Sequence, residues 1–229
     1  MSMADRGAVF LRGGRPSPPL RSVPIARKSA GIMAKLILAS SSRSRADLLR
    51  NAGVSFDQRP ALIDEAAVKE AMLAEGAPAR DIADTLAELK AQRVAGRVPG
   101  LVLAGDQVLV CEGRLYDKPR TAAEAGAHLR SLRGRTHELL SAAVIYEGGV
   151  PVWRHVGTAR LTMRPFSDAF LADYLKEHGE DLTATVGAYR LEAGGAQLFS
   201  RVEGDYFSVL GLPLLEILGF LRTREICVE

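Results

Sequence analysis

The feature of this sequence that most constrains its fold is a short hydrophobic strand that leads directly into a helix. Residues 36–39, LILA, are all apolar and predict a buried strand, and an apolar pattern typical of a helix is under way by residue 46. The junction between them, residues 40–45, reads SSSRSR and is entirely polar. Small hydroxyl groups and two arginines therefore lie where a strand ends and a helix begins.

A junction of this kind is suited to binding an anion. The first backbone N–H groups of a helix lack partners within the helix and lie at the positive end of its dipole. Serine hydroxyls and the planar guanidinium of Arg43 or Arg45 add donors that match a phosphate group. In the alternative interpretation, one serine only caps the helix and both arginines face solvent. The segment by itself leaves both interpretations open.

The rest of the chain interleaves strand and helix patterns. Strands are predicted at residues 54–58, 101–104, 108–111, 137–147 and 152–163, and helices at residues 81–97, 121–132, 167–178 and 213–221. Thr121 and Glu124 have the spacing of a capping box. Since no strict strand–helix–strand repeat occurs, a mixed sheet with helices on its faces is favoured over an all-parallel sheet.

Two predicted details concern charged residues. The strand at 101–111 is expected to break at residues 105–107, which would place Asp106 at a strand break. In the helix at 81–97 the predicted buried stripe consists of Ile82, Leu86, Leu89 and Val94. Lys90 and Arg93 lie off that stripe.

Charge is unevenly distributed along the 229 residues. Residues 1–33 contain six basic residues and one acidic residue, a net charge of +5, so the rest of the chain carries −2 of the total of +3. We therefore predict a basic disordered extension at 1–33, a folded domain at 34–224 and a short tail at 225–229. The extension is either a targeting peptide or sequence upstream of a start at Met33. Nucleic-acid binding would rest on this extension alone, and none is expected of the slightly acidic domain.

The composition also argues against a membrane protein and a cysteine-based site. The longest apolar stretch, residues 209–221, is interrupted by glycine, proline and glutamate and falls short of the roughly 18 to 20 residues of a spanning helix. Cys111 and Cys227 lie far apart and have no metal-binding spacing. A cytoplasmic location is the simplest expectation.

Several polar residues together form a set suited to phosphate chemistry. Arg45, Lys90, Lys118 and Arg135 could neutralise a polyphosphate. Glu65 and Asp106 could hold a divalent ion or orient a water molecule. Each of these residues has an ordinary surface or turn interpretation when taken alone. Hydrolysis of a phosphoanhydride needs both kinds of group, because charge must be stabilised while the nucleophile is held in line.

Eight sequence blocks carry a resemblance to a known family. The blocks are LILASSSRSRADLL at 36–49, DE at 64–65, LAELKA at 86–91, LAGDQVLV at 103–110, DKP at 117–119, LRGRTHE at 132–138, VGAYRLE at 186–192 and VEGDYFSVLGLPL at 202–214. In this order they resemble the Maf family of nucleoside triphosphate pyrophosphatases, once described as septum formation inhibitors. The resemblance covers nearly all of residues 33–222.

The resemblance implies an α/β fold with a mixed twisted sheet flanked by helices and two lobes around a cleft, similar to the inosine triphosphate pyrophosphatases. It implies hydrolysis of canonical or modified nucleoside triphosphates to the monophosphate and pyrophosphate, which would clean nucleotide pools, with a divalent cation such as Mg²⁺ or Mn²⁺. It also permits a homodimer. The alternative is a nucleotide-binding regulator of septum formation with little turnover, which would not need Asp106.

The resemblance also assigns roles to individual residues. Asp106 matches the catalytic acidic residue, usually written as the proton acceptor, and Glu65 matches a carboxylate that acts with it. Residues that match the phosphate-binding positions are Ser40, Arg45, Lys90 and Lys118. A carboxylate with an ordinary pKa of about 3.9 is a weak base at neutral pH. We therefore favour metal-linked carboxylates that position the water, and a metal-free arrangement with a direct base stays open.

Ser44, Gln107 and Glu192 match the positions that select the base. Gln107 and Glu192 resemble the subgroup that prefers 7-methyl-GTP, and a glutamate can accept hydrogen bonds from guanine N–H groups. Ser44, however, replaces the tryptophan of that subgroup, so aromatic stacking on a charged methylguanine is lost. Purine or modified-purine triphosphates are the predicted substrates. Alternatively, Gln107 and Glu192 only satisfy backbone groups at strand ends. Tyr189 is predicted to be a core residue, and His137 a strand residue with a local hydrogen bond.

Overall fold

A mixed sheet organises the part of the chain that the structure describes, which in this computed structural model is residues 35–179 and 181–227. The predicted basic extension at 1–33 lies outside the described residues. The seven described strands are β1 (Leu36–Leu38), β2 (Phe56–Gln58), β3 (Leu101–Cys111), β4 (Arg114–Tyr116), β5 (Thr136–Glu147), β6 (Val150–Met163) and β7 (Phe199–Gly204).

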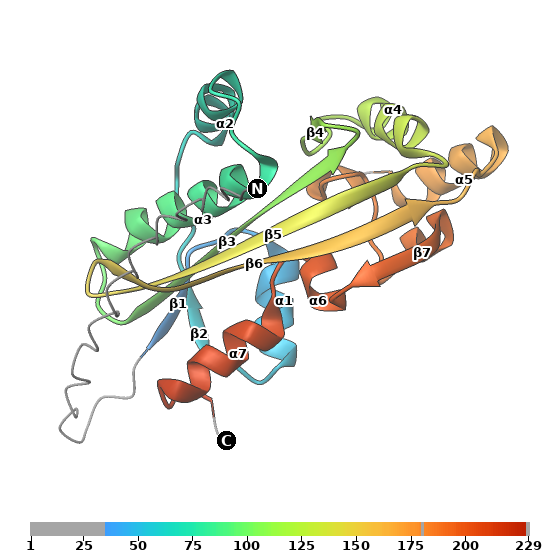
Figure 1. Ribbon diagram of the computed structural model, residues 1–229. Coiled ribbons are helices and arrows are strands. Elements are labelled where there is room, and N and C mark those ends of the chain that lie inside the picture. Colours follow the sequence, from blue (N-terminus) through green and yellow to red (C-terminus); the bar gives the residue numbers. More distant parts are fainter. Residues whose placement is uncertain (1–34, 180, 228–229) are drawn as a thin grey trace, which may run out of the picture. The chain divides into compact units, whose positions relative to one another are not determined.

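The strands follow the order β2-β1-β3-β5-β6-β7, and β4 pairs with β3 beside this path (Figure 1). β1 runs parallel to β2 and β3, whereas every other described pair is antiparallel. The long β5–β6 hairpin continues the sheet away from the parallel part. The prediction of an open mixed sheet is therefore confirmed.

Seven α-helices flank the sheet in the described residues. They are α1 (Arg43–Asn51), α2 (Glu65–Ala74), α3 (Ala79–Ala95), α4 (Ala122–Leu132), α5 (Asp168–His178), α6 (Tyr206–Val209) and α7 (Leu214–Thr223), with 3-10 turns η1 (Asp181–Ala184) and η2 (Gly194–Leu198). The predicted caps of α4 and α5 are present, because Thr121 accepts from the Glu124 backbone and Ser167 from the Phe170 backbone. None of these helices is both long and apolar enough to cross a membrane.

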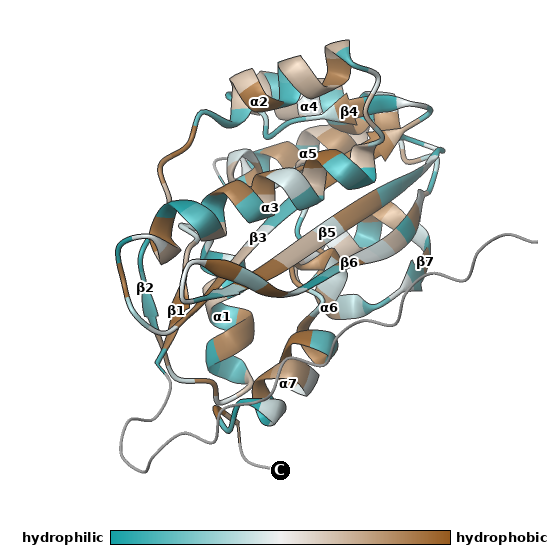
Figure 2. Ribbon diagram, turned by 60° about the vertical axis from the view of Figure 1, so that its left-hand side comes forward, coloured by the Kyte–Doolittle hydropathy of each residue, from teal (hydrophilic) through white to brown (hydrophobic). Residues whose placement is uncertain are grey.

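Alternation of side chains along the strands creates two apolar layers. Val102 and Ala104 of β3 point to one face and pack against α3, whereas Leu101 and Leu103 point to the other face and pack against α1 and α7. Figure 1 shows α3 on one side of the sheet and α1 and α7 on the other. Figure 2 shows the corresponding hydrophobic stripe along β3 and β5. The two central strands are buried on both faces, as their nearly continuous apolar sequences predict.

The predicted break in β3 is wrong. The strand continues through residues 105–107, which pair with residues 141–143 of β5. Gly105 is required by close packing, because a Cβ atom there would lie 2.9 Å from Cδ2 of Leu212 and 3.3 Å from Nε of Arg45. The glycine therefore signals a close neighbour in space and not a turn.

The prediction that Lys90 lies off the buried stripe of this helix is also wrong. Lys90 follows Ile82 and Leu86 at four-residue spacing on the buried face of α3, and its residue exposure is 7%. The apolar pattern alone excluded it because a lysine on a buried face needs a partner that only the tertiary fold supplies.

Candidate active site

A cavity of about 590 Å³ opens at the carboxyl end of β1. β1 pairs with residues 101–103 of β3 and β4 with residues 109–111, so the stretch of β3 between them has no strand partner on that edge within the described chain. Ligands in open α/β sheets bind outside the carboxyl ends of parallel strands, where the topology changes. The cavity occupies such a place and has the volume of a small-molecule site.

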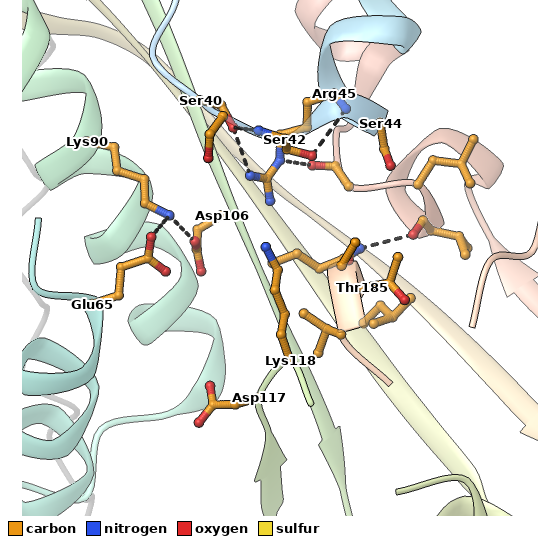
Figure 3. A pocket seen from close by; sticks show the side chains of 18 of the residues that line it. Ser40, Ser42, Ser44, Arg45, Glu65, Lys90, Asp106, Asp117, Lys118 and Thr185 are labelled. Carbon is orange, nitrogen blue, oxygen red and sulfur yellow. Dashed lines mark hydrogen bonds and ion pairs between the residues drawn. The ribbon is translucent and has the colours of Figure 1, made fainter. Parts of the chain in front are cut away.

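The polar junction after β1 forms one wall of the cavity (Figure 3). Ser42 caps α1 and accepts a hydrogen bond from the Arg45 backbone at 3.4 Å. Ser40 Oγ accepts from Nη1 of Arg45 at 3.3 Å, and Nε of Arg45 donates to the Gly211 carbonyl at 2.9 Å. Both interpretations of the junction thus apply to different residues, because one serine caps while Ser40 and Arg45 line the cavity. Arg43 faces solvent, with 95% of its side chain exposed.

Arg45 places a buried positive charge in this wall. Burial lowers the pKa of Arg45, and the negative charges of Asp106 and Glu65 oppose that change. A guanidinium remains protonated under all ordinary conditions. It is therefore a fixed cation whose unpaired N–H groups are available to an anionic ligand in a medium of low polarity.

Lys90 joins the two carboxylates on the opposite wall. Its Nζ lies 2.5 Å from Oδ1 of Asp106 and 2.8 Å from Oε1 of Glu65 (Figure 3). Glu65 is the first residue of α2, directly after the Asp64 cap, while Asp106 projects from the middle of β3 toward α3. Oδ2 of Asp106 is buried and has no hydrogen-bond partner among the described residues. An acceptor atom in that state is free to interact with a bound ligand, water molecule or metal ion.

The pKa values of Lys118 and Glu65 are shifted by burial and by the other charged groups that line the cavity. Burial would raise the pKa of Glu65, but its hydrogen bond to Lys90 and the charges of Lys90, Lys69 and Lys118 lower it overall. Burial and repulsion by Arg45 lower the pKa of Lys118. Binding a polyphosphate would relieve this repulsion, so the cavity favours an anionic ligand.

The donor set fits one mode of divalent-metal binding. No cluster of three or more metal-ligating side chains occurs in residues 35–179 and 181–227. Glu65 and Asp106 supply two carboxylates, and the unpartnered Oδ2 of Asp106 is an available oxygen ligand. Mg²⁺ is commonly held by one or two carboxylates together with substrate phosphates and water. The residues therefore fit a metal that arrives with a phosphorylated ligand.

The predicted base-selecting residues also line the cavity, but two of them have protein partners. The amide nitrogen of Gln107 donates to the carbonyl oxygens of Ser208 and Val209 at 2.9 and 3.1 Å. Glu192 accepts from Nε of Arg190 at 3.0 Å. The structure thus brings all nine predicted site residues to one cavity: Ser40, Ser44, Arg45, Glu65, Lys90, Asp106, Gln107, Lys118 and Glu192.

Several further lining residues were not predicted from the sequence. Lys69 of α2 forms an ion pair with Asp117 at 2.6 Å, and Arg190 lies on the wall before η2. The predicted cation Arg135, in contrast, is not among the lining residues and pairs with Glu112. All ten residues of α2 are half-buried or exposed, and its contact with the core is made by Val68 and Met72, a stripe too short to have revealed the helix. Its only sequence signal was Asp64, which caps it.

Tyr189 and His137 form a buried pair beside the cavity. The hydroxyl of Tyr189 lies 2.8 Å from Nε2 of His137, and the two residues are 4% and 1% exposed. The prediction that Tyr189 belongs to the core is confirmed, although it also contributes to the cavity wall. The expected local hydrogen bond of His137 is wrong, because its partner is 52 residues away.

Burial of His137 predicts an acid-sensitive fold. Burial lowers the pKa of His137 from 6.5 to about 4. As the pH falls between these values the unfolded chain binds a proton that the folded chain does not, so stability present above pH 6.5 is lost toward pH 4. The loss from this group is about 2 to 3 kcal/mol, at about 1.4 kcal/mol per pKa unit.

This prediction is checked by measuring the free energy of unfolding by urea at several pH values from 7 to 4. Because carboxylates titrate in the same pH range, the wild type is compared with His137→Gln. The free energy of unfolding of this variant should fall less between pH 7 and pH 4, by the amount that His137 contributes in the wild type. His155→Gln on the neighbouring strand β6 serves as the matched histidine change. Identical slopes for the wild type and His137→Gln would contradict the prediction.

The fold and the cavity define a class of protein. A mixed α/β sheet that presents buried cations opposite paired carboxylates, at the carboxyl end of a parallel strand, is built to bind and process a polyanion. The chain belongs to the Maf family, because the family described as Maf-like protein matches residues 35–224. This range coincides closely with the described part of the chain.

Curated relatives resemble the chain over nearly their whole length. A protein of Jannaschia sp. (strain CCS1) named nucleoside triphosphate pyrophosphatase 1 is 53% identical over 84% of this chain and 98% of its own. One of Roseobacter denitrificans named nucleoside triphosphate pyrophosphatase is 54% identical, over 82% of this chain and 96% of its own. A third, of Rhizobium meliloti, is named 7-methyl-GTP pyrophosphatase and is 50% identical, over 82% and 94%.

Proposed function

We propose that this chain hydrolyses nucleoside triphosphates to the nucleoside monophosphate and pyrophosphate. The observation that carries the proposal is the pair of carboxylates bridged by Lys90, which faces the cations Arg45 and Lys118 across one cavity. The relatives named nucleoside triphosphate pyrophosphatase support it, since they share about half of their residues with this chain.

In the proposed reaction, water attacks the α-phosphorus and the bond between that phosphorus and the bridging oxygen of the β-phosphate breaks. Pyrophosphate leaves with the bridging oxygen, and the water oxygen becomes part of the monophosphate. Ser40, Arg45 and Lys118 bind the phosphates and neutralise the leaving group. Asp106 orients the water, while Lys90 fixes the orientation of both carboxylates. In the arrangement without a metal, the free Oδ2 of Asp106 receives the proton of the water; otherwise that proton passes to solvent.

A divalent metal is part of the proposal. Glu65 and Asp106 would hold it together with the substrate phosphates, and it would supply charge neutralisation and a more acidic water. Its support is the unpartnered oxygen of Asp106 beside a second carboxylate. A homodimer stays a prediction from the family resemblance, and a cytoplasmic location stays a prediction from the composition.

The proposed substrates are purine or modified-purine triphosphates. Glu192 is the acidic residue of the wall around residues 185–192 and can accept hydrogen bonds from a base with N–H donors. Ser44 cannot stack on a methylated base as an aromatic residue would, although a relative is named 7-methyl-GTP pyrophosphatase. Gln107 contributes less as a donor, because its amide nitrogen already donates to two carbonyl groups.

A panel of canonical and 7-methylated nucleoside triphosphates tests the reaction and the base preference together. Monophosphate, pyrophosphate and orthophosphate are measured separately, with Mg²⁺ or Mn²⁺ and with chelator. We expect equal amounts of monophosphate and pyrophosphate, a preference for purines, and loss of turnover with chelator. Release of orthophosphate alone would contradict attack at the α-phosphorus. Tight nucleotide binding without turnover would favour the regulator of septum formation.

A further inference from the structure

The cavity wall that carries Glu192 is an irregular segment, residues 185–193, between η1 and η2. Its backbone is held in an uncommon conformation, because Ala188 has a φ of 60° while it is completely buried. A left-handed conformation of a residue other than glycine is unfavourable and persists only where its surroundings enforce it. The segment must therefore be fixed by contacts with the rest of the domain.

The hydrogen bond between Tyr189 and His137 is a buried anchor of this segment. His137 belongs to β5 in the centre of the sheet, and the ring of Phe199 packs edge-on against Tyr189 at 4.8 Å between centroids. The chain folds tightly over the Tyr189 ring, since a Cβ atom on Gly187 would lie 2.7 Å from Cε1 of Tyr189. The position of Tyr189 is thus set by the sheet and not by the loop itself.

Tyr189 is three residues before Glu192, whose carboxylate would contact the base. Arg190 follows Tyr189 directly, and its Nε donates to Oε1 of Glu192 at 3.0 Å. On the far side, a Cβ atom on Gly195 would collide with the carbonyl oxygen of Arg190, so this part of the backbone is held from both sides. Displacement of Tyr189 would therefore move the carboxylate of Glu192 within the cavity.

We propose that His137 is a positioning residue for substrate selection: its hydrogen bond to Tyr189 holds residues 185–193 so that Glu192 contacts the base of the nucleotide. This inference rests on the proposed function, in which the base of the nucleotide binds to the cavity wall formed by residues 185–193. Arg45, which would bind the phosphates, and Lys90, which orients the two carboxylates, come from α1 and α3, which are separate elements. Loss of the anchor should then weaken recognition of the base and leave the chemical step nearly intact.

The test compares kcat and KM of the wild type and Tyr189→Phe for the best and the poorest triphosphates of the panel. Removing one hydroxyl keeps the ring in the core and deletes only the hydrogen bond. We expect KM for the best substrate to rise about fivefold, the effect typical of one lost hydrogen bond, with less than a twofold change in kcat. KM for the poorest substrate should hardly change, so discrimination between bases falls.

Two further variants at His137 separate positioning from general stability. His137→Gln keeps a polar partner within reach of Tyr189 and should retain most of the discrimination, whereas His137→Leu should lose it. Tyr146→Phe is the matched control, because this variant also loses a hydroxyl bond, to Glu88 at 2.9 Å, and Tyr146 is not among the residues that line the cavity. It should keep the wild-type discrimination.

Failure of the positioning role of His137 can be distinguished from failure of the proposed hydrolysis. If the wild type turns over and Tyr189→Phe lowers thermal stability but leaves the ratio of kcat/KM between bases unchanged, the positioning role is overturned. If the wild type releases no pyrophosphate from any triphosphate, the proposed reaction fails. In that case equilibrium binding of the same nucleotides to wild type and Tyr189→Phe decides the positioning role.

Discussion

Replacing Asp106 by Asn is expected to lower pyrophosphate release about 1,000-fold, within the range that a positioned proton acceptor contributes. The amide is similar in shape to the carboxylate, and its oxygen can still accept a hydrogen bond from Lys90, which is 2.5 Å from Oδ1 in the wild type. The variant nevertheless lacks, at the position of the free Oδ2, the charged oxygen that would act either as a metal ligand or as the proton acceptor. The chemical step is lost while the fold remains.

Purified Asp106→Asn is assayed for monophosphate and pyrophosphate with the best substrate, and nucleotide binding is measured by calorimetry. Binding should persist, because Arg45 and Lys118 are unchanged. Asp47→Asn, an exposed α1 carboxylate paired with Arg50, is the matched control and should retain full turnover. Unchanged turnover in Asp106→Asn would refute the catalytic role and leave the regulator with little turnover as the better hypothesis.

The sequence allowed much of the fold to be predicted because most elements have local signals. The helices at α4 and α5 have serine or threonine caps, and the strands β5 and β6 have long apolar patterns, so each could be recognised within its own segment. α2 could not, because none of its residues is fully buried and only Val68 and Met72 of this helix pack against the core, while five of its residues line the cavity. The residues of a helix that line a binding site are selected for contacts with the ligand, so they do not show the apolar periodicity from which a helix is recognised.

The residues of the site could be predicted from the sequence, but their orientations and their contacts with one another could not. The family resemblance pointed to Lys90 and Asp106, yet the helical pattern placed Lys90 on the wrong face, since its burial depends on a carboxylate 16 residues away. The hydrogen bond between His137 and Tyr189 spans 52 residues and has no local signature. Contacts between distant segments depend on the sheet order, which strand periodicity does not specify.

The ion pair at Lys90 makes the same residue important for stability. Lys90 and Asp106 side chains are 8% and 6% exposed, whereas that of Glu65 is 45% exposed. Removing one partner of a buried pair leaves an uncompensated charge, which is more destabilising than removing both. A substitution of Lys90 should therefore affect folding as well as hydrolysis.

Lys90→Met is expected to abolish hydrolysis and to lower the free energy of unfolding at pH 7 by about 3 to 5 kcal/mol. Methionine fills nearly the same volume as the lysine stem, so the loss reports the stranded carboxylate and not a cavity. Urea unfolding of Lys90→Met/Asp106→Asn should show less destabilisation than Lys90→Met, because the stranded charge is gone. Lys176→Met, an exposed lysine of α5, should change stability by less than about 0.5 kcal/mol. Equal stability of the single and double variants would show that the buried charge of Asp106 does not need Lys90.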